Sequence, residues 1–238
     1  MYYHFNSELV PTEQQPFVQA LLDSKNFEKS DRLLGYSKGR GTTWFLRTQP
    51  ELGVDSVLRH YYRGGLFGKI VKDRYWFSGL NQTRATQEFE LLAQMHRWGL
   101  PVPRPIAFKI RRCCGFYQAD ILLEKINDTQ DLSQLLQTQS LKNAEYQVIG
   151  QLIRQLHAHQ VHHSDLNIHN ILRENANGKF WLIDFDKCHI QAGEAWKLAN
   201  LDRLLRSFHK EQARLGIQFN EANWQALMNG YLQKNAEN

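Results

Sequence analysis

The chain has 238 residues, of which 42% are hydrophobic and 22% are charged, and this composition is typical of a globular protein with room for two lobes. Its net charge of +5 favours an anionic partner, although no segment is typical of a module that reads nucleic acid. The three cysteines form no disulfide framework, no apolar run approaches the roughly 20 residues that cross a bilayer, and the first residues lack the pattern of a signal peptide.

The first part of the chain predicts a short helix and a glycine-rich hairpin. An irregular start over residues 1–30 contains a helical pattern around Phe17 to Leu22. Two strands, at 32–34 and 42–46, then flank a loop that contains Gly35, Gly39 and Gly41. Because glycine lets backbone amides approach phosphate oxygens, this loop is a candidate phosphate cover. A plain hairpin turn remains the alternative.

Residues 55–62 predict an alternating strand that carries Arg59, and residues 84–98 predict an amphipathic helix. Glu90 falls on the polar side of that helix, whereas Glu88 shares the inward stripe with Ala85, Leu92 and Met95. A carboxylate on a buried stripe needs a partner, because an unpaired buried charge is costly. We therefore expect Glu88, not Glu90, to pair with Arg59, with an exposed helix glutamate as the alternative.

The proline-rich run 99–105 ends this helix, and two strands follow at 106–110 and 116–123. Beyond about residue 127 the apolar period becomes helical. We expect three buried helix faces, formed by Tyr146, Ile149, Ile153 and Leu156, then by Leu198, Leu201, Leu205 and Phe208, and finally by Trp224, Leu227, Tyr231 and Leu232.

The stretch from His163 to Asp186 carries the residues best suited to chemistry. Asp165 and Asn170 lie five positions apart in a predicted loop, and Asp184 ends an apolar run that follows the turn signal Asn177-Gly178. A short hairpin would bring Asp184 beside Asn170. A carboxylate and an amide oxygen suit magnesium, and a further carboxylate can then orient an attacking hydroxyl. The pattern indicates phosphoryl transfer.

These residues resemble the protein-kinase-like phosphotransferases, whose catalytic loop reads His-x-Asp followed by Asn and whose metal motif opens with Asp-Phe. The resemblance implies an α+β fold in a single two-lobe domain: a small antiparallel N-lobe with one helix (about 1–124), a hinge (about 124–127) and a mainly helical C-lobe (about 128–238). It implies ATP and Mg²⁺ as cofactors. By this resemblance Asp165 is the catalytic base, Asn170 and Asp184 are magnesium ligands, and His163 braces the loop.

The same resemblance places a nucleotide site on the first lobe. Arg59 occupies the slot of the usual phosphate-binding lysine, with Lys69 as a displaced candidate, and Glu88 is its ion-pair partner. Adenine would bond to the backbone near Glu124 and Ile126. Ser164 replaces an arginine of regulated protein kinases and Asp186 replaces a glycine, so the pattern is closer to small-molecule kinases than to protein kinases.

The segment 59–77 is basic and aromatic. Its five basic residues against one aspartate give +4, and beyond Arg59 they are Arg63, Lys69, Lys72 and Arg74. Such a segment could meet lipid phosphates, at about 1 kcal/mol for each basic residue, or grip an anionic sugar. A solvated loop is the alternative.

Residues 57–66 (VLRHYYRGGL), the run 99–105 (GLPVPRP) and the spacing to His163 resemble the bacterial lipopolysaccharide core kinases over nearly the whole chain. The resemblance implies transfer of the γ-phosphate of ATP to the 4-hydroxyl of 3-deoxy-D-manno-octulosonic acid (Kdo) on a lipid A precursor. It also implies a peripheral position at the cytoplasmic face of the bacterial inner membrane. The alternatives are a heptose kinase of the same family and a pseudokinase that binds an anionic lipid or a protein.

Overall fold

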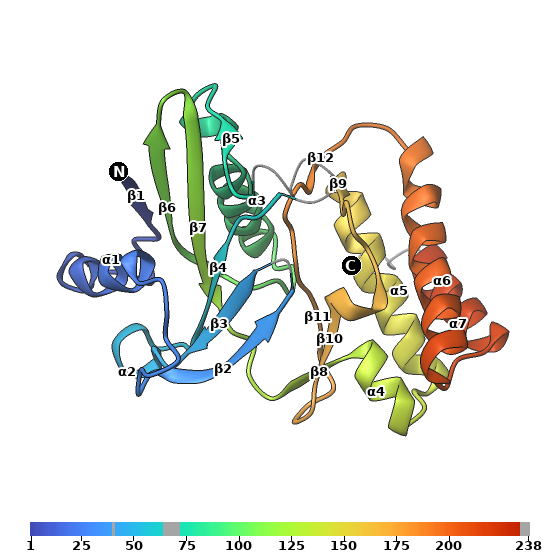
Figure 1. The fold of residues 1–238 in the computed structure, drawn as a ribbon. Helices are drawn as coiled ribbons and strands as arrows, with labels where there is room; N and C mark the ends of the chain where they lie inside the picture. The colour runs from blue at the N-terminus through green and yellow to red at the C-terminus, as the bar shows by residue number, and fades with distance from the viewer. Residues whose placement is uncertain (40, 64–71, 234–238) are drawn as a thin grey trace. The chain divides into compact units, whose positions relative to one another are not determined.

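The computed structural model of the protein describes residues 1–39, 41–63 and 72–233 (Figure 1). The chain forms two compact units: unit 1 consists of Met1–Gln94 and Pro103–Asn127, and unit 2 of Met95–Val102 and Asp128–Asn238. That both units belong to one domain, with a hinge near 124–127, stays a prediction. Among the described residues, no helix combines the length and the apolar character that a bilayer crossing requires.

Unit 1 is built on an antiparallel sheet in the order β1-β6-β7-β4-β3-β2, with β5 paired to β7. The strands are β1 (Tyr2–Phe5), β2 (Leu33–Lys38), β3 (Thr42–Leu46), β4 (Ser56–His60), β5 (Tyr75–Trp76), β6 (Pro105–Cys113) and β7 (Phe116–Glu124). The α-helices are α1 (Gln15–Asp23), α2 (Gln49–Leu52) and α3 (Arg84–Arg97), and short 3₁₀ turns cover Thr12–Gln14 and Leu80–Gln82.

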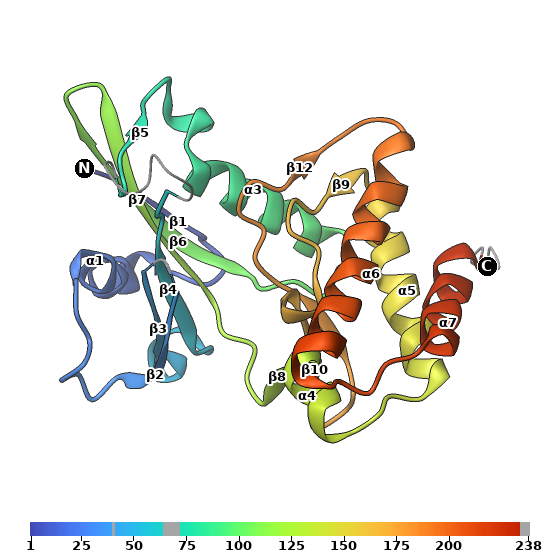
Figure 2. The same cartoon turned by 45° about the vertical axis from the view of Figure 1, so that its right-hand side comes forward.

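The two faces of this sheet carry different helices, as Figure 2 shows for α1 and α3. Successive strand residues point to opposite faces. In β4, Leu58 therefore joins the apolar cluster under α1, whereas Arg59 faces α3 and bonds to Glu88. On the α3 face, Phe89 packs edge-on against Phe108 of β6 with ring centroids 5.2 Å apart. The sheet thus fixes the direction of Arg59.

Two features of unit 1 differ from the sequence-based expectation. The start of the chain is not irregular, because β1 pairs with β6 and its His4 stacks on Phe108 at 5.1 Å. Gly35 was expected in the glycine loop, and this is wrong: Gly35 lies within β2, whose ladder with β3 continues as far as Lys38. A register shift between Leu33 and Gly35 lets the strand pass through the glycine.

Unit 2 is mainly helical. Its helices are α4 (Leu132–Thr138), α5 (Asn143–Ala158), α6 (Ala195–Leu215) and α7 (Glu221–Leu232). Three strands, β8 (Thr129–Asp131), β10 (Ile171–Glu174) and β11 (Phe180–Leu182), form a small antiparallel sheet, and β9 (Val161–His162) pairs with β12 (His189–Ile190). A 3₁₀ turn at Ile168–Asn170 leads into β10.

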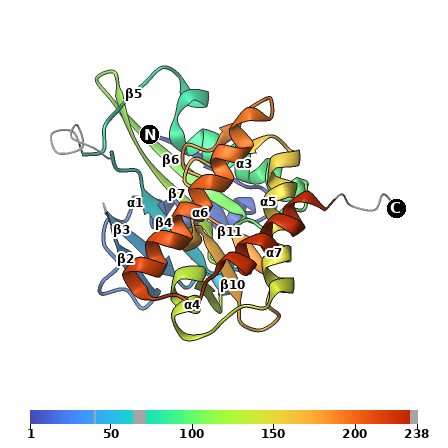
Figure 3. The same cartoon turned by 90° about the vertical axis from the view of Figure 1, so that its right-hand side faces the viewer.

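Helices α5 and α7 lie against each other at van der Waals distance, and Figure 3 shows α7 running beside α5. A Cβ added to Gly150 would lie 2.0 Å from the carbonyl oxygen of Leu227, and one added to Gly230 would lie 2.0 Å from that of Gln147. Both glycines are needed for this approach. The predicted buried face of α5 is confirmed, since all four of its named residues are buried: Tyr146, Ile149, Ile153 and Leu156.

The predicted faces of the last two helices are partly wrong. Leu198 is 66% exposed and Leu232 is 68% exposed, although both were expected to be buried. In α6 the buried positions are instead Trp196, Asn200, Leu201, Leu204, Phe208 and Glu211. The leucine spacing of this helix allows two stripes, and the stripe that is buried includes two polar residues. Asn200 is one of them, and it contacts the loop that carries Asp165.

Candidate active site

His163 braces the loop that follows β9. Its buried ring accepts a hydrogen bond from the backbone N–H of Asp165 at Nδ1 (3.2 Å) and donates from Nε2 to the carbonyl oxygen of Ile183 (3.0 Å). Burial lowers the pKa of His163, so the ring stays neutral. One nitrogen of a neutral imidazole accepts and the other donates, which is what these two bonds require. His163 therefore fixes Asp165 relative to the residue before Asp184.

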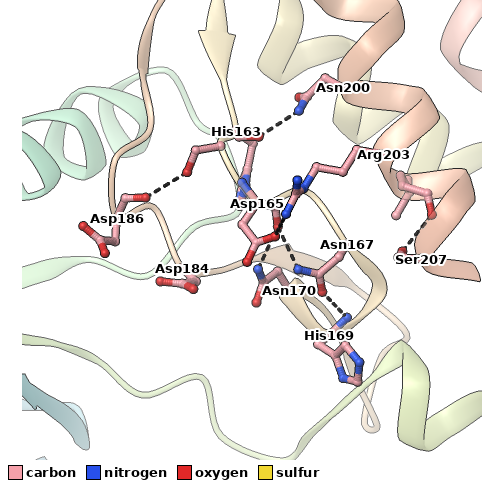
Figure 4. A network of polar contacts seen from close by, with 12 residues as sticks. His163, Asp165, Asn167, His169, Asn170, Asp184, Asp186, Asn200, Arg203 and Ser207 are labelled. Atoms are coloured by element: carbon pink, nitrogen blue, oxygen red, sulfur yellow. Dashed lines mark hydrogen bonds and ion pairs between the residues drawn. The ribbon is translucent and has the colours of Figure 1, made fainter. Parts of the chain in front are cut away.

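Asp165 presents a half-exposed carboxylate, and its Oδ1 pairs with Nη2 of Arg203 (Figure 4). Partial burial raises the pKa of Asp165, but the hydrogen bond and the charge of Arg203 outweigh it, so the pKa lies below its usual value. The backbone carbonyl of Asp165 accepts two side-chain amides, from Asn167 and Asn170, each at 2.9 Å. The carboxylate is thus ionised at neutral pH and held on a firmly bonded loop.

Asn170 and Asp184 are brought together by a hairpin, as expected. Ile171 of β10 is in register with Leu182 of β11, and the N–H of Ile183 donates to the carbonyl of Asn170 at 3.0 Å. The amide nitrogen of Asn170 is used on the loop, so its amide oxygen is the end that suits a cation. Together with the Asp184 carboxylate this oxygen donor set fits a hard divalent cation such as Mg²⁺.

The backbone at Asp184 adds a second indication of function. Its φ is +63°, in the left-handed region that non-glycine residues rarely adopt. Conformations of this kind are costly and cluster at active sites, where the surrounding structure holds them. The bond between His163 and the preceding carbonyl of Ile183 is part of that surrounding structure.

Three side chains of α6 hold this loop, and none of them was predicted from the sequence. Asn200 donates to the carbonyl of His163 at 2.7 Å and Arg203 contacts Asp165 (Figure 4). Ser207 accepts from the N–H of Ile168 at 3.1 Å. Their spacing of three and four residues places them on one face of the helix. Three polar residues at helical spacing beside a buried stripe are the signal that could have found them.

In unit 1, the predicted ion pair between β4 and α3 is confirmed. Arg59 donates from Nη2 to both carboxylate oxygens of Glu88, at 2.6 and 2.7 Å, and Glu88 is only 1% exposed. Tyr61 adds a third bond, from its hydroxyl to Glu88 at 2.7 Å. Burial and the charge of Glu88 raise the pKa of Tyr61 well above its usual value, so its hydroxyl stays a donor. Whether Arg59 serves a nucleotide stays a prediction.

The other predicted nucleotide residues lie at the ends of strands in unit 1. Gly39 and Gly41 form the turn between β2 and β3, where the N–H of Gly39 donates to the carbonyl of Gly41 at 2.9 Å. Glu124 ends β7, and its carboxylate accepts two bonds from the guanidinium of Arg104 at 2.9 and 3.0 Å. Ile126 follows just before unit 1 ends. The roles of these residues stay predictions.

Three of the basic residues predicted to meet an anionic acceptor lie together in unit 1. The backbone N–H of Arg63 donates to the carbonyl of Lys72 at 2.7 Å, and its side chain donates from Nε to the carbonyl of Arg74 at 2.6 Å. The guanidinium of Arg63 also lies over the ring of Tyr75, 5.0 Å from its centroid. Lys69, the displaced candidate, lies outside the described residues.

A polar pocket of about 340 Å³ opens on the other face of this sheet. His60 bonds there to Asp120 at 2.7 Å and to Asp73 at 3.3 Å, and Lys109 pairs with Asp120 at 3.1 Å. Burial lowers the pKa of His60, but the bonds and charges of Asp120 and Asp73 outweigh it, so the pKa is raised. The network ties β4, β6 and β7 to the segment before β5.

The fold and the family of the chain follow from three comparisons. The chain resembles the structure of the Cydia pomonella granulovirus kinase PK-1, with a TM-score of 0.50 at 13% identity, over 91% of this chain and 70% of that one. The expected protein-kinase-like α+β fold is thereby confirmed.

Two curated relatives, each named 3-deoxy-D-manno-octulosonic acid kinase, come from Mannheimia succiniciproducens and Haemophilus influenzae. The first is 51% identical over 92% of each chain, and the second is 50% identical over 98% of this chain and 96% of that one. These matches confirm the expectation that the protein is a sugar kinase of lipopolysaccharide synthesis. Residues 25–231 also match the model of the lipopolysaccharide kinase (Kdo/WaaP) family, and the chain therefore belongs to that family.

Proposed function

We propose that the protein phosphorylates the 4-hydroxyl of a Kdo residue on a Kdo-lipid A precursor, at the expense of ATP, during synthesis of the lipopolysaccharide inner core. The observation that carries the proposal is the loop in which Asp165 presents an ionised carboxylate beside the hard oxygen donors of Asn170 and Asp184. The names of relatives about 50% identical over nearly the whole chain support the choice of acceptor.

In the proposed reaction, Asp165 orients the acceptor hydroxyl and receives its proton. The hydroxyl oxygen forms a bond to the γ-phosphorus, the bond from that phosphorus to the bridging oxygen of ADP breaks, and the proton passes from Asp165 to solvent. His163 keeps the loop in place by its two bonds, so that the carboxylate does not have to be reoriented as the proton moves. Pre-set geometry of this kind lowers the barrier to transfer.

Each unit, taken by itself, carries groups of the kind that bind a nucleotide. Asn170 and Asp184 would hold Mg²⁺, which supplies charge compensation on the triphosphate. Arg59, kept in one position by Glu88 and by the sheet, binds the phosphates, and Gly39 and Gly41 cover them through backbone amides. Adenine bonds to the backbone near Glu124 and Ile126, which leaves the Glu124 carboxylate with Arg104.

The acceptor is an anionic glycolipid, so the enzyme works at the cytoplasmic face of the inner membrane. The cluster of Arg63, Lys72 and Arg74 supports this location, because basic residues near an anionic bilayer contribute about 1 kcal/mol each. Tyr75 beside Arg63 adds an aromatic ring of the kind found at membrane interfaces.

The test is to incubate the purified protein with magnesium-ATP and a Kdo-lipid A precursor and to look by mass spectrometry for one added phosphate. Fragmentation then assigns the phosphate to a sugar and a hydroxyl. Asp165→Asn keeps the shape of the side chain and removes the base, so we expect turnover to fall by roughly 100- to 10,000-fold. The matched control is Asp202→Asn, at an exposed position on α6, which should leave turnover unchanged.

Three outcomes would change the assignment. Turnover of Asp165→Asn within tenfold of the parent would show that Asp165 is not the base. Phosphate on a heptose acceptor, with none on Kdo, would move the protein to a heptose kinase. Failure of magnesium-ATP to raise the melting temperature, together with no product, would favour a pseudokinase, because a ligand that binds the folded state stabilises it.

A further inference from the structure

Arg203 has no part in the phosphoryl transfer proposed above, yet it touches the carboxylate that does. Its Nη2 reaches Oδ1 of Asp165 from the middle of α6 (Figure 4). On either side of it along the helix, Asn200 and Ser207 bond to main-chain atoms of the loop, at His163 and Ile168. The backbone of Arg203 is therefore held opposite Asp165 by other residues, and the ion pair is not needed to keep it there.

The ion pair itself contributes little to stability. It joins one guanidinium nitrogen to one carboxylate oxygen, and the two side chains are 47% and 50% exposed. Among the described residues, Asp165 is the hydrogen-bonding partner that the structure gives to Arg203. Exposed pairs of this kind are easily exchanged for other partners, because solvent screens the two charges and holding the long arginine side chain in one geometry costs entropy. A substrate anion can replace Asp165 at low cost.

An acidic sugar needs a cation at this place. The loop and the segment after β11 carry the carboxylates of Asp165 and Asp186 besides that of Asp184, whose charge Mg²⁺ would compensate, and both Asp165 and Asp186 repel a carboxylate on an acceptor. In Kdo one ring carbon separates the carbon that bears the acid from the carbon that bears the 4-hydroxyl. A hydroxyl directed at Asp165 thus brings the acid close to the residue beside Asp165. Guanidinium binds carboxylate through two parallel hydrogen bonds, which Lys cannot do.

We propose that Arg203 is a specificity-determining residue, which contacts Asp165 in the free enzyme and binds the carboxylate of the acidic sugar when the acceptor hydroxyl arrives at Asp165. This inference rests on the proposed function, and it names the group by which the acceptor is recognised. The Asp165 oxygen that Arg203 leaves then accepts the hydrogen bond from the hydroxyl. The site selects an acidic sugar over a neutral sugar of the same shape.

The test combines a change in the enzyme with a change in the acceptor. Turnover is measured for the parent and for Arg203→Ala, with the acceptor as the free acid and as its Kdo methyl ester. For Arg203→Ala on the acid we expect the KM for the acceptor to rise roughly 10- to 100-fold, since hydrogen bonds to charged groups are worth this much, with the KM for ATP unchanged. Replacing the acid by the ester should raise the acceptor KM of the parent by a similar factor and should not raise that of Arg203→Ala any further.

Arg206→Ala is the matched control. It removes the same side chain from the same helix one turn later, and the part of the chain that the structure describes shows no contact between Arg206 and the loop. Its KM values should equal those of the parent. Arg203→Lys keeps the charge but not the planar fork, and it should recover only part of the loss on the acid.

Several results would overturn the inference. One is an acceptor KM of Arg203→Ala that lies within threefold of the parent value. Another is an increase in acceptor KM from the ester that multiplies the increase from Arg203→Ala. The third is a rise in the KM for ATP with no change in the KM for the acceptor. If the parent transfers no phosphate, the proposed function fails. Calorimetric binding of free Kdo and of its methyl ester to the parent and to Arg203→Ala then decides the role of Arg203, because that readout requires no turnover. Equal binding of acid and ester by the parent would refute it.

Discussion

Asn200 offers the sharpest test of how unit 2 holds its loop. It is buried on α6, its amide nitrogen donates to the carbonyl of His163 at 2.7 Å, and its amide oxygen accepts from Nε2 of His157 at 3.0 Å. His157 in turn accepts from the hydroxyl of Tyr231 at 2.9 Å. One chain of hydrogen bonds thus runs from α7 through α5 and α6 to the loop.

The substitution Asn200→Ala breaks this chain at two places. It leaves the Nε2–H of His157 and the carbonyl of His163 buried without their partner, and each unsatisfied group costs roughly 1–3 kcal/mol. We therefore expect the free energy of unfolding to fall by roughly 2–5 kcal/mol, measured by equilibrium denaturation in urea with an unchanged m-value. The control is Leu198→Ala, on the exposed side of the same helix, which should change it by less than about 0.5 kcal/mol.

A loss below about 0.5 kcal/mol for Asn200→Ala would refute the reasoning. The pH dependence gives a second check on the same residues. Burial lowers the pKa of His157 to about 4, so its contribution to stability is full above the unfolded value near 6.5 and is lost as the pH falls toward 4. Over that window the shift corresponds to about 3 kcal/mol, and His157→Gln should flatten the acid limb of the stability curve.

Three further outcomes are expected. Glu88→Gln should lower the free energy of unfolding by roughly 2–5 kcal/mol, whereas Glu90→Gln, on the exposed side of α3, should leave it nearly unchanged in the same urea titration. The pKa of His60 is raised in the folded protein, so the stabilisation that His60 provides is full below about pH 6.5 and is lost as the pH rises through its folded-state pKa. Between about pH 6 and pH 9 the melting temperature should therefore fall less for His60→Gln than for the parent. Gly230→Ala should lower the melting temperature because its Cβ meets backbone, and Gly39→Ala, where a Cβ meets nothing within 4 Å, should not; equal melting temperatures would contradict this.

The parts of the site that could be predicted are those set by local geometry or by a single strong rule. The turn at Asn177-Gly178, where Gly178 has a φ of +74°, closes a hairpin whose register brings Asp184 to Asn170. The pairing of Glu88 with Arg59 followed from a carboxylate on a buried stripe, which cannot remain unpaired. Both arguments need only a few residues of context.

The features that could not be predicted depend on how helices and strands that are distant in the sequence pack against one another. The leucines of α6 allow two stripes, and the choice between them is made by the loop that Asn200 and Ser207 bind, which is why Leu198 was placed wrongly. Gly35 was predicted in a loop because glycine weakens strands, yet its pairing with Phe45 of β3 keeps it within β2. The helical spacing of Asn200, Arg203 and Ser207 marks a polar face on α6, but it does not show that the partner of Arg203 is Asp165, which lies 38 residues earlier in the chain.

On α6, the residues that hold the loop in place are different from the residue that we propose to select the acceptor. Asn200 and Ser207 bond to main-chain atoms, the carbonyl of His163 and the N–H of Ile168, which any residue at position 163 and any residue except proline at position 168 would present. Arg203, set between them on the same face, contacts a side chain and remains half exposed. Because the two anchors do not depend on Arg203, a change at that position alters which acceptor is favoured without releasing the loop. The same helix could therefore support a different acceptor through one substitution, while His163, Asp165 and Asn170 keep their positions.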